Sequence, residues 1–207
     1  AARGITATTM KNATSVDFDS SGNLWASDTG NSRILKYPAA NLVTGGAATV
    51  ALGQSDLTSA ARGITATTMK NATNVAFDSS GNLWVADKGN SRILKYPAAN
   101  LATGGAATVA LGQSDLTSKT KGLTTTTMGN KTSSIDFDSS GNLWVADKGN
   151  NRILKYPAAN LATGGAATVV LGQSDFTSDA QGLTATTMKN ATSVTFDSSG
   201  NLWVADK

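Results

Sequence analysis

The residues best able to do chemistry in this sequence are aspartates and arginines at one fixed spacing. The pattern D-x-x-N-x-R occurs first at Asp28, Asn31 and Arg33 and recurs in the two following repeats. A ring of guanidinium groups would bind an anionic ligand through paired hydrogen bonds. Alternatively, each Asp and Arg would pair across the turn between them and pin the backbone. Recurrence in every repeat favours the pin, with structural aspartates Asp28, Asp87 and Asp147; the anion-binding candidates are Arg33, Arg92 and Arg152.

The side chains that perform most acid–base and metal chemistry are missing from the chain. There is no His, no Cys and no Glu, so all 14 acidic residues are Asp. His and Glu do most general acid–base work near neutral pH, and His is the commonest zinc ligand. Most of the aspartates lie beside Gly, Asn or Ser, where turns form readily. We therefore expect no enzymatic activity and no cofactor.

The DSSGN loops look like calcium loops but offer too few ligands. A calcium ion normally takes roughly six to eight oxygens, including a bidentate acidic residue. Each loop has one carboxylate, and Asp17 and Asp136 add a second in only two copies. We expect no metal at the loops that begin at Asp19, Asp78, Asp138 and Asp197.

The chain is built from near-identical units. The tetrapeptide GNLW begins at residues 22, 81, 141 and 200, which is a period of 59 or 60 residues. The first two units differ at only six positions, which indicates recent duplication or deliberate construction. We divide the single repeat domain, 1–207, into units 1–59, 60–118 and 119–178 and a half unit, 179–207.

Short alternating apolar runs predict four strands in each full unit. A long return rich in Thr, Ser and Gly, too poor in helix formers for a crossover helix, then leads to the next unit. This pattern predicts an all-β protein, a β-propeller of four-stranded antiparallel blades with three full repeats and a half repeat. Helical, leucine-rich and β-helical repeats fit less well. In the second unit the predicted strands are 74–77, 83–87, 92–96 and 107–111.

The phrase FDSSGNLWVADKGNSRILKY, at residues 77–96, resembles the NHL-repeat family of β-propellers. The phrase LGQSD and the Thr-rich return after it are similar to longer bacterial and archaeal members. The resemblance implies a propeller fold. Enzymes related to this family, such as lactonases, amidating lyases and streptogramin lyases, rely on a metal held by His, Glu or Asp or on a catalytic His. Since His and Glu are absent, the resemblance assigns no catalytic residue to this chain.

One Trp stands at the same position of every unit. Regularly spaced aromatic rings stack on sugars or bases when they are exposed. In a propeller they more often wedge between neighbouring blades. We therefore predict a structural role for Trp25, Trp84, Trp144 and Trp203.

One position on the first predicted strand differs from unit to unit, while its neighbours stay Val or Ile and Phe. If first strands line the axis, this side chain lies beside the central channel or between blades. A site that changes between blades suits ligand recognition, and neutral drift is the alternative. These ligand-binding candidates are Asp17, Ala76, Asp136 and Thr195.

The fold and composition together favour a binding or scaffolding module. A protein, a glycan or a small molecule is the ligand class that fits a face built from the long returns. The alternative is nucleic-acid binding, since some NHL propellers use a basic face for RNA. A cationic excess of only three is a weak indication of anionic partners, so nucleic acid is the less favoured partner. The cations in the returns are Arg3, Lys11, Arg62, Lys70, Lys119, Lys121, Lys131 and Lys189.

The half unit predicts association between chains. Propellers close with about four to eight blades, so three and a half blades leave both ends of the arc uncovered. Two chains related by a two-fold axis would form a ring, and we favour this dimer, although neither end supplies the outer strands that the other lacks. A contact that does not close would build a head-to-tail filament or matrix. A fragment of a longer array or an engineered assembly unit are further alternatives.

Nothing in the sequence predicts a membrane span or a signal peptide. The chain has no apolar run of about 18 residues and no basic start followed by an apolar stretch. It begins without Met, so a leader removed before residue 1 is an alternative. Richness in Thr, Ser, Asn and Gly favours an extracellular or periplasmic location.

Overall fold

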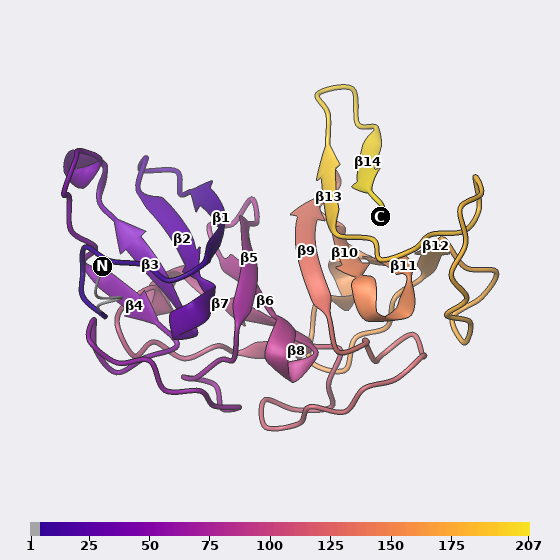
Figure 1. Cartoon of the computed structure of the whole chain (residues 1–207), viewed down its shortest axis with the longest axis horizontal. Coiled ribbons are helices and arrows are strands. Elements are labelled where there is room, and N and C mark those ends of the chain that lie inside the picture. The colour runs from indigo at the N-terminus through magenta and orange to yellow at the C-terminus, as the bar shows by residue number, and fades with distance from the viewer. Residues whose placement is uncertain (1–4) are drawn as a thin grey trace.

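Consecutive strands of each unit pair as antiparallel neighbours and form a blade. The computed structural model describes residues 5–207. Three four-stranded sheets follow one another along the chain, and a two-stranded sheet ends the arc (Figure 1). The predicted propeller architecture of three full blades and a half blade is confirmed. Within residues 5–207, no helix has the length and apolar character that a membrane crossing requires.

The strands recur at the same place in every unit. Blade one contains β1 (Ala13–Phe18), β2 (Leu24–Asp28), β3 (Arg33–Tyr37) and β4 (Val50–Leu52). Blade two contains β5 (Ala72–Phe77), β6 (Leu83–Asp87), β7 (Arg92–Tyr96) and β8 (Val109–Leu111). Blade three contains β9 (Thr132–Phe137), β10 (Leu143–Asp147), β11 (Arg152–Tyr156) and β12 (Val169–Leu171). The half blade contains β13 (Ser193–Phe196) and β14 (Leu202–Ala205).

Short 3-10 turns connect the second strand to the third and follow the third. The first kind comprises η1 (Thr29–Asn31), η3 (Lys88–Asn90) and η5 (Lys148–Asn150). The second kind comprises η2 (Ala39–Asn41), η4 (Ala98–Asn100) and η6 (Ala158–Asn160). The first kind lets the chain reverse within a few residues, whereas the second kind begins the longer connection to the fourth strand.

The DSSGN loop closes the hairpin between the first and second strands. In blade two, the carboxylate of Asp78 accepts hydrogen bonds from the backbone N–H groups of Ser80 and Asn82, at 2.9 and 3.0 Å. Gly81 has a φ of +76°, a left-handed conformation that favours glycine. The Trp84 indole also donates to Asp78, at 2.9 Å. The loop aspartate therefore organises its own turn and fixes the following Trp.

The last strand of the blade is shorter than predicted. In the second unit it begins at Val109, whereas the alternating pattern predicted a start at Ala107. The backbone N–H of Ala107 instead donates to the carbonyl of Ala66 in the return segment, at 2.8 Å. This hydrogen bond replaces one that would have extended the sheet, and it fastens the return segment to its own blade.

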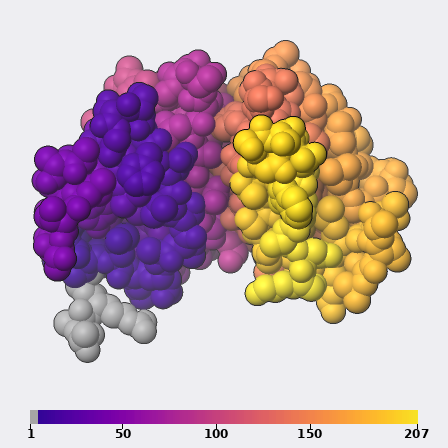
Figure 2. Space-filling view, turned by 90° about the horizontal axis from the view of Figure 1, so that it is seen from above, coloured from indigo at the N-terminus to yellow at the C-terminus, as the bar shows by residue number. Residues whose placement is uncertain are grey.

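First strands lie innermost and touch their counterparts in the next blade. Contacts run from β1 to β5, from β5 to β9 and from β9 to β13. Threonines near the start of these strands also bond across blades, since the Thr14 hydroxyl donates to the carbonyl of Thr73 at 2.7 Å. Figure 2 shows the indigo first blade and the yellow half blade on either side of a hollow, so the arc is open between them.

The hydrophobic core lies between successive blades. Trp25, Ile34 and Leu52 of the first unit form one buried cluster with residues of the second unit, among them Met69 and Val75. A second cluster joins the second and third units in the same way. A blade therefore buries its faces only where it has a neighbour, which is the reason for repeating it.

Candidate functional site

A cavity on the propeller axis gathers one residue set from the three blades and the half blade. Its volume is about 270 Å³, and it lies between the inner strands β1, β5, β9 and β13. It brings together the four ligand-binding candidates that sequence reasoning took from separate repeats. The lining residues are Ser15, Val16, Asp17, Asn74, Val75, Ala76, Ser134, Ile135, Asp136, Ser193, Val194 and Thr195.

The carboxylate of Asp17 links blade one to blade two. Its Oδ1 accepts a hydrogen bond from the backbone N–H of Phe18, at 2.8 Å, and its Oδ2 accepts one from Phe77, at 2.9 Å. Asp136 repeats the arrangement with Phe137 at 2.8 Å and Phe196 at 3.1 Å. These carboxylates hold neighbouring inner strands together, a role that sequence reasoning did not assign to them.

Between blades two and three a different side chain makes the link. Ala76 has no polar group, and Asn74 on the same strand takes over. The Asn74 Oδ1 accepts a hydrogen bond from the backbone N–H of Ile135, at 3.1 Å, and its Nδ2 donates to Ser15, at 3.0 Å. Neighbouring inner strands are therefore joined by an Asp carboxylate at two blade junctions and by an Asn amide at the junction between them.

The side chains of the axial cavity are suited to hydrogen bonding. Its side chains are hydroxyl, amide and carboxylate groups beside Val, Ile and Ala. Its two carboxylates, those of Asp17 and Asp136, already accept backbone hydrogen bonds. Among the described residues 5–207, no three acidic side chains come together in a way that could hold a metal ion. The cavity could therefore bind a small polar ligand through hydrogen bonds.

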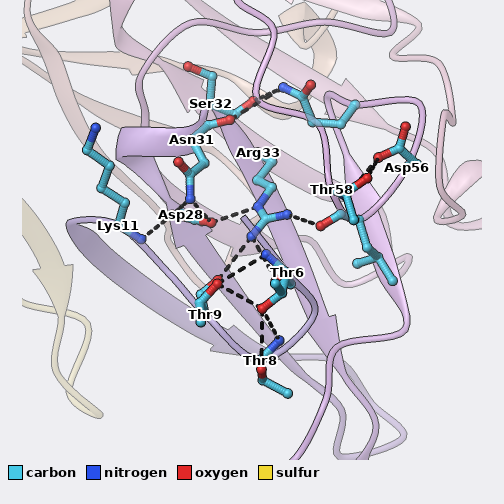
Figure 3. A network of polar contacts seen from close by, with 12 residues as sticks. Thr6, Thr8, Thr9, Lys11, Asp28, Asn31, Ser32, Arg33, Asp56 and Thr58 are labelled. Atoms are coloured by element: carbon cyan, nitrogen blue, oxygen red, sulfur yellow. Dashed lines mark hydrogen bonds and ion pairs between the residues drawn. The ribbon is translucent and has the colours of Figure 1, made fainter. Parts of the chain in front are cut away.

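Each Asp–Arg pair forms a buried polar network between the blade and the return segments (Figure 3). In blade one the Arg33 Nε donates to Asp28 at 2.7 Å, and both side chains are fully buried. Asp28 also accepts hydrogen bonds from the backbone N–H of Lys11, at 2.7 Å, and from the Asn31 amide, at 2.9 Å. The other two blades repeat the pair, at 2.7 Å for Arg92–Asp87 and 2.9 Å for Arg152–Asp147.

The remaining donors of the arginine bind backbone carbonyls. Arg33 Nη1 donates to Leu57, and Nη2 donates to both Thr6 and Thr9 at 3.0 Å. One side chain thus fastens the return that enters the blade and the loop that leaves it. Because the guanidinium is buried and its donors are engaged, an anion from solution does not reach it. The geometry of Arg33, Arg92 and Arg152 is that of the structural pin.

The Trp of each blade packs against a Phe of the next. Trp25 meets Phe77 edge to face, with ring centroids 6.0 Å apart. A lysine from the third strand covers the indole, since the Lys36 Nζ lies 5.5 Å from its centroid. The same pairs recur at 5.9 Å as Trp84–Phe137 and Trp144–Phe196. Sequence reasoning singled out the Trp but not the Phe, although the Phe recurs with the same period.

The two ends of the arc expose the two halves of this contact. Trp203 in the half blade is 64% exposed, because no Phe of a following blade lies against it in the described chain. Phe18 in blade one, the counterpart of Phe77, is 54% exposed, and Val16 beside it is 58% exposed. Each end of the arc therefore leaves uncovered one of the two rings that pair at an internal blade interface.

Acid is expected to weaken the DSSGN loops. Burial opposes ionisation of Asp78, but hydrogen bonds from Trp84 and Asn82 outweigh it and hold the pKa of this carboxyl below its ordinary value of 3.8. In the half blade, the Trp203 and Asn201 hydrogen bonds lower the pKa of Asp197 to about 2. A folded pKa below the unfolded one means that the native state binds fewer protons. Its stabilising effect is complete above about pH 5 and is lost as the pH falls toward 2.

Thermal unfolding at a series of pH values between about 7 and 2 checks this expectation. The melting temperature should fall as the pH decreases below about 5, and it should fall less for Asp78→Asn than for the unchanged chain. An equal pH dependence of the two proteins would show that the Asp78 carboxylate contributes nothing.

Four lysines from the second, third and half units lie near one another: Lys88, Lys131, Lys148 and Lys207. Burial, followed by the charges of Lys207, Lys88 and Lys131, lowers the pKa of Lys148. Arg3, one of the cations proposed for a nucleic-acid face, lies outside the described residues. Nucleic-acid binding by this face stays a prediction.

Comparison with known protein families gives a match in two of the units. The NHL repeat model matches residues 70–96 and 133–156, which are the regions of the first three strands in blades two and three. No curated protein sequence matches the chain.

Solved structures share the fold at low sequence identity. A streptogramin B lyase is 13% identical, with a TM-score of 0.57 and coverage of 98% of this chain and 49% of that chain. A protein of unknown function from Bacteroides thetaiotaomicron is 14% identical, with a TM-score of 0.62 and coverage of 94% and 44%. An auxiliary nutrient binding protein from the same species is 11% identical, with a TM-score of 0.57 and coverage of 95% and 46%. The chain spans about half the length of these proteins.

Proposed function

We propose that this NHL-repeat β-propeller chain is a non-enzymatic binding and scaffolding module that completes its ring by association with a second copy of itself. The proposal has two parts. The first concerns how the ring closes, and the second concerns what the closed ring binds. One observation carries the first part: the end faces expose Trp203 and Phe18, the two partners of the internal blade contact.

The internal blade interfaces supply the template for the contact between chains. Three times within the chain, a Trp packs edge to face on the Phe of the next blade, with the centroids 5.9–6.0 Å apart. In the proposed dimer, Trp203 of one copy packs on Phe18 of the other. Burying exposed aromatic surface of this kind stabilises association, because aromatic side chains dominate interface energetics.

The proposed contact is head to tail, so the angle between the two chains at this contact determines whether a ring or a filament forms. When two such contacts close around the axis, they give a ring with two-fold symmetry, and when they do not close, they give a filament. We favour the dimer because β1, β5, β9 and β13 already curve around one axial cavity. A second copy continues this curvature and encloses the axis.

The axial cavity and the face around it are the proposed binding surface. The cavity offers hydroxyl, amide and carboxylate groups, which suit a polar small molecule or an extended glycan or protein segment. A protein described as nutrient binding has the same fold, which supports a binding role for this propeller. Catalysis is not proposed, because the chain contains no His, Glu or Cys and its Asp–Arg pairs are buried.

Sedimentation velocity over a dilution series tests the proposed ring closure. We expect Trp203→Ala and Phe18→Ala each to raise the dissociation constant of the dimer by about thirtyfold or more, since truncating a central aromatic anchor costs at least about 2 kcal/mol. Ser199→Ala, an exposed change in the loop before Trp203, is the matched control and should leave the dimer unchanged. Sedimentation of all four proteins as monomers, or equal effects of Ser199→Ala and Trp203→Ala, would refute the proposal.

A further inference from the structure

A second cavity lies beside the return segment of blade two and shares no lining residue with the axial cavity. It has a volume of about 300 Å³ and is lined by Arg62, Gly63, Ile64, Lys70, Asn90 and Lys119. Three of its six lining residues are cations. The cavity plays no part in the proposed ring closure or in the axial binding surface.

The three cations have no acidic partner. Within residues 5–207, the ion pairs are the buried ones of Arg33, Arg92 and Arg152 with their own aspartates. Arg62, Lys70 and Lys119 are exposed at the cavity. Their positive charges are therefore not neutralised by neighbouring carboxylates.

Hydrogen bonds fix the backbone on both sides of Arg62. The residue before it is held by Gln54, whose side chain donates to the Ala61 carbonyl at 2.8 Å and accepts from the Ala61 N–H at 2.9 Å. The residue after it is held by Asn90, whose amide donates to the Gly63 carbonyl at 2.8 Å. Arg62 thus extends from a return segment fastened on both sides.

The two lysines extend from anchored backbone as well. The N–H of Lys70 donates to the buried Asp87 carboxylate at 2.7 Å, and its carbonyl accepts from Gly89 at 2.8 Å. Thr120, next to Lys119, forms a pair of hydrogen bonds with the Gln113 side chain, both at 2.8 Å. Because the return segment is preorganised, a ligand at the cavity orders only the cationic side chains.

The repeat itself provides a comparison, because the same three positions differ between units. In the third unit they are Lys121, Gly129 and Asp179, which together carry no net charge. In the first unit the third position is Ala60. Only the second unit has cations at all three positions, so the cationic cluster is not a general feature of the repeat.

From this arrangement we propose that the blade-two cavity binds one small doubly charged oxyanion, such as a phosphate or sulfate group. The Arg62 guanidinium matches two oxygens of a tetrahedral anion through its planar fork, and Lys70 and Lys119 contribute compact charges from two further directions. A cavity of about 300 Å³ has room for such a group.

Isothermal titration of the full chain with inorganic phosphate, and separately with sulfate, tests the proposal at low ionic strength of about 0.02 M. We expect saturable binding of one anion per chain. Arg62→Gln and Lys119→Asp should each weaken it by about tenfold or more, because each removes a charged contact. Lys121→Gln, the matched change in the third unit, should leave the affinity unchanged. Unaltered melting temperatures in the absence of anion would show that the variants fold.

A further titration with a single-stranded RNA oligonucleotide separates a site for one oxyanion from a diffuse basic face. Absence of saturable phosphate and sulfate binding to the unchanged chain overturns the proposal. The proposal is also overturned if the chain binds RNA but neither phosphate nor sulfate, and if Lys121→Gln and Arg62→Gln weaken the RNA binding equally. Loss of phosphate binding on Arg62→Gln alone, with Lys121→Gln unaffected, supports it.

Discussion

Replacing Asp87 by Ala should lower the free energy of unfolding by about 3–5 kcal/mol, because it leaves the fully buried Arg92 guanidinium without its counter-charge. The substitution also removes the acceptor for the backbone N–H of Lys70 and for the Asn90 amide. Arg92 holds the carbonyls of Thr65 and Thr68 through the same guanidinium, so the return segment loses its anchor. Urea unfolding followed by circular dichroism measures the difference.

Asp206 is the matched control for this experiment. It occupies the same place in the half blade, is exposed, and contacts the backbone N–H of Lys189 at 2.7 Å. Asp206→Ala should therefore change the free energy of unfolding by less than about 1 kcal/mol, as expected for a substitution outside a buried network. Equal effects of Asp87→Ala and Asp206→Ala would contradict the view that the Asp–Arg pairs pin each blade.

Replacing Trp84 by Ala should lower the free energy of unfolding by about 3–5 kcal/mol, the usual cost of removing a large buried aromatic side chain. Trp84 is fully buried between blades two and three. The change removes its contact with Phe137, its hydrogen bond to Asp78 and the surface that Lys95 covers. Urea unfolding in dilute solution, where association between chains is weak, isolates this effect.

Trp203→Ala gives the comparison at the open end of the arc. Because Trp203 is 64% exposed, its removal should cost less than about 1 kcal/mol in the separated chain. Comparable losses for Trp84→Ala and Trp203→Ala in dilute solution would mean that the blade contact does not govern stability. If Trp203→Ala lowers the free energy of unfolding only slightly but weakens association, Trp203 acts at the contact between chains.

Much of the fold could be predicted from periodicity alone. Alternating runs such as LWVAD at residues 83–87, separated by Gly-containing turns, identify strands, and a unit of 59 or 60 residues with four strands identifies a blade. The start of the last strand could not be predicted, because Ala107 alternates like a strand residue but bonds to Ala66 of the return segment. That contact depends on tertiary structure.

The candidate site was predictable in its location and not in its detail. Unequal residues at one position of an innermost strand, such as Asp17 and Ala76, must converge on the axis once the blades are arranged radially. The direction of the Asp17 carboxylate toward the N–H of Phe77 depends on the rotation between blades, which no single unit encodes. The sequence placed Arg62, Lys70 and Lys119 among eight cations of the return segments but could not single out these three, since Lys119 belongs to the next unit of the sequence.

Multi-angle light scattering of the purified chain over a wide concentration range tests the central claim most directly, because one chain has a mass of 21.0 kDa. The account predicts a stable plateau at twice this mass, lost on dilution in the Trp203→Ala variant. A mass of one chain at every concentration would contradict closure of the ring by a second copy.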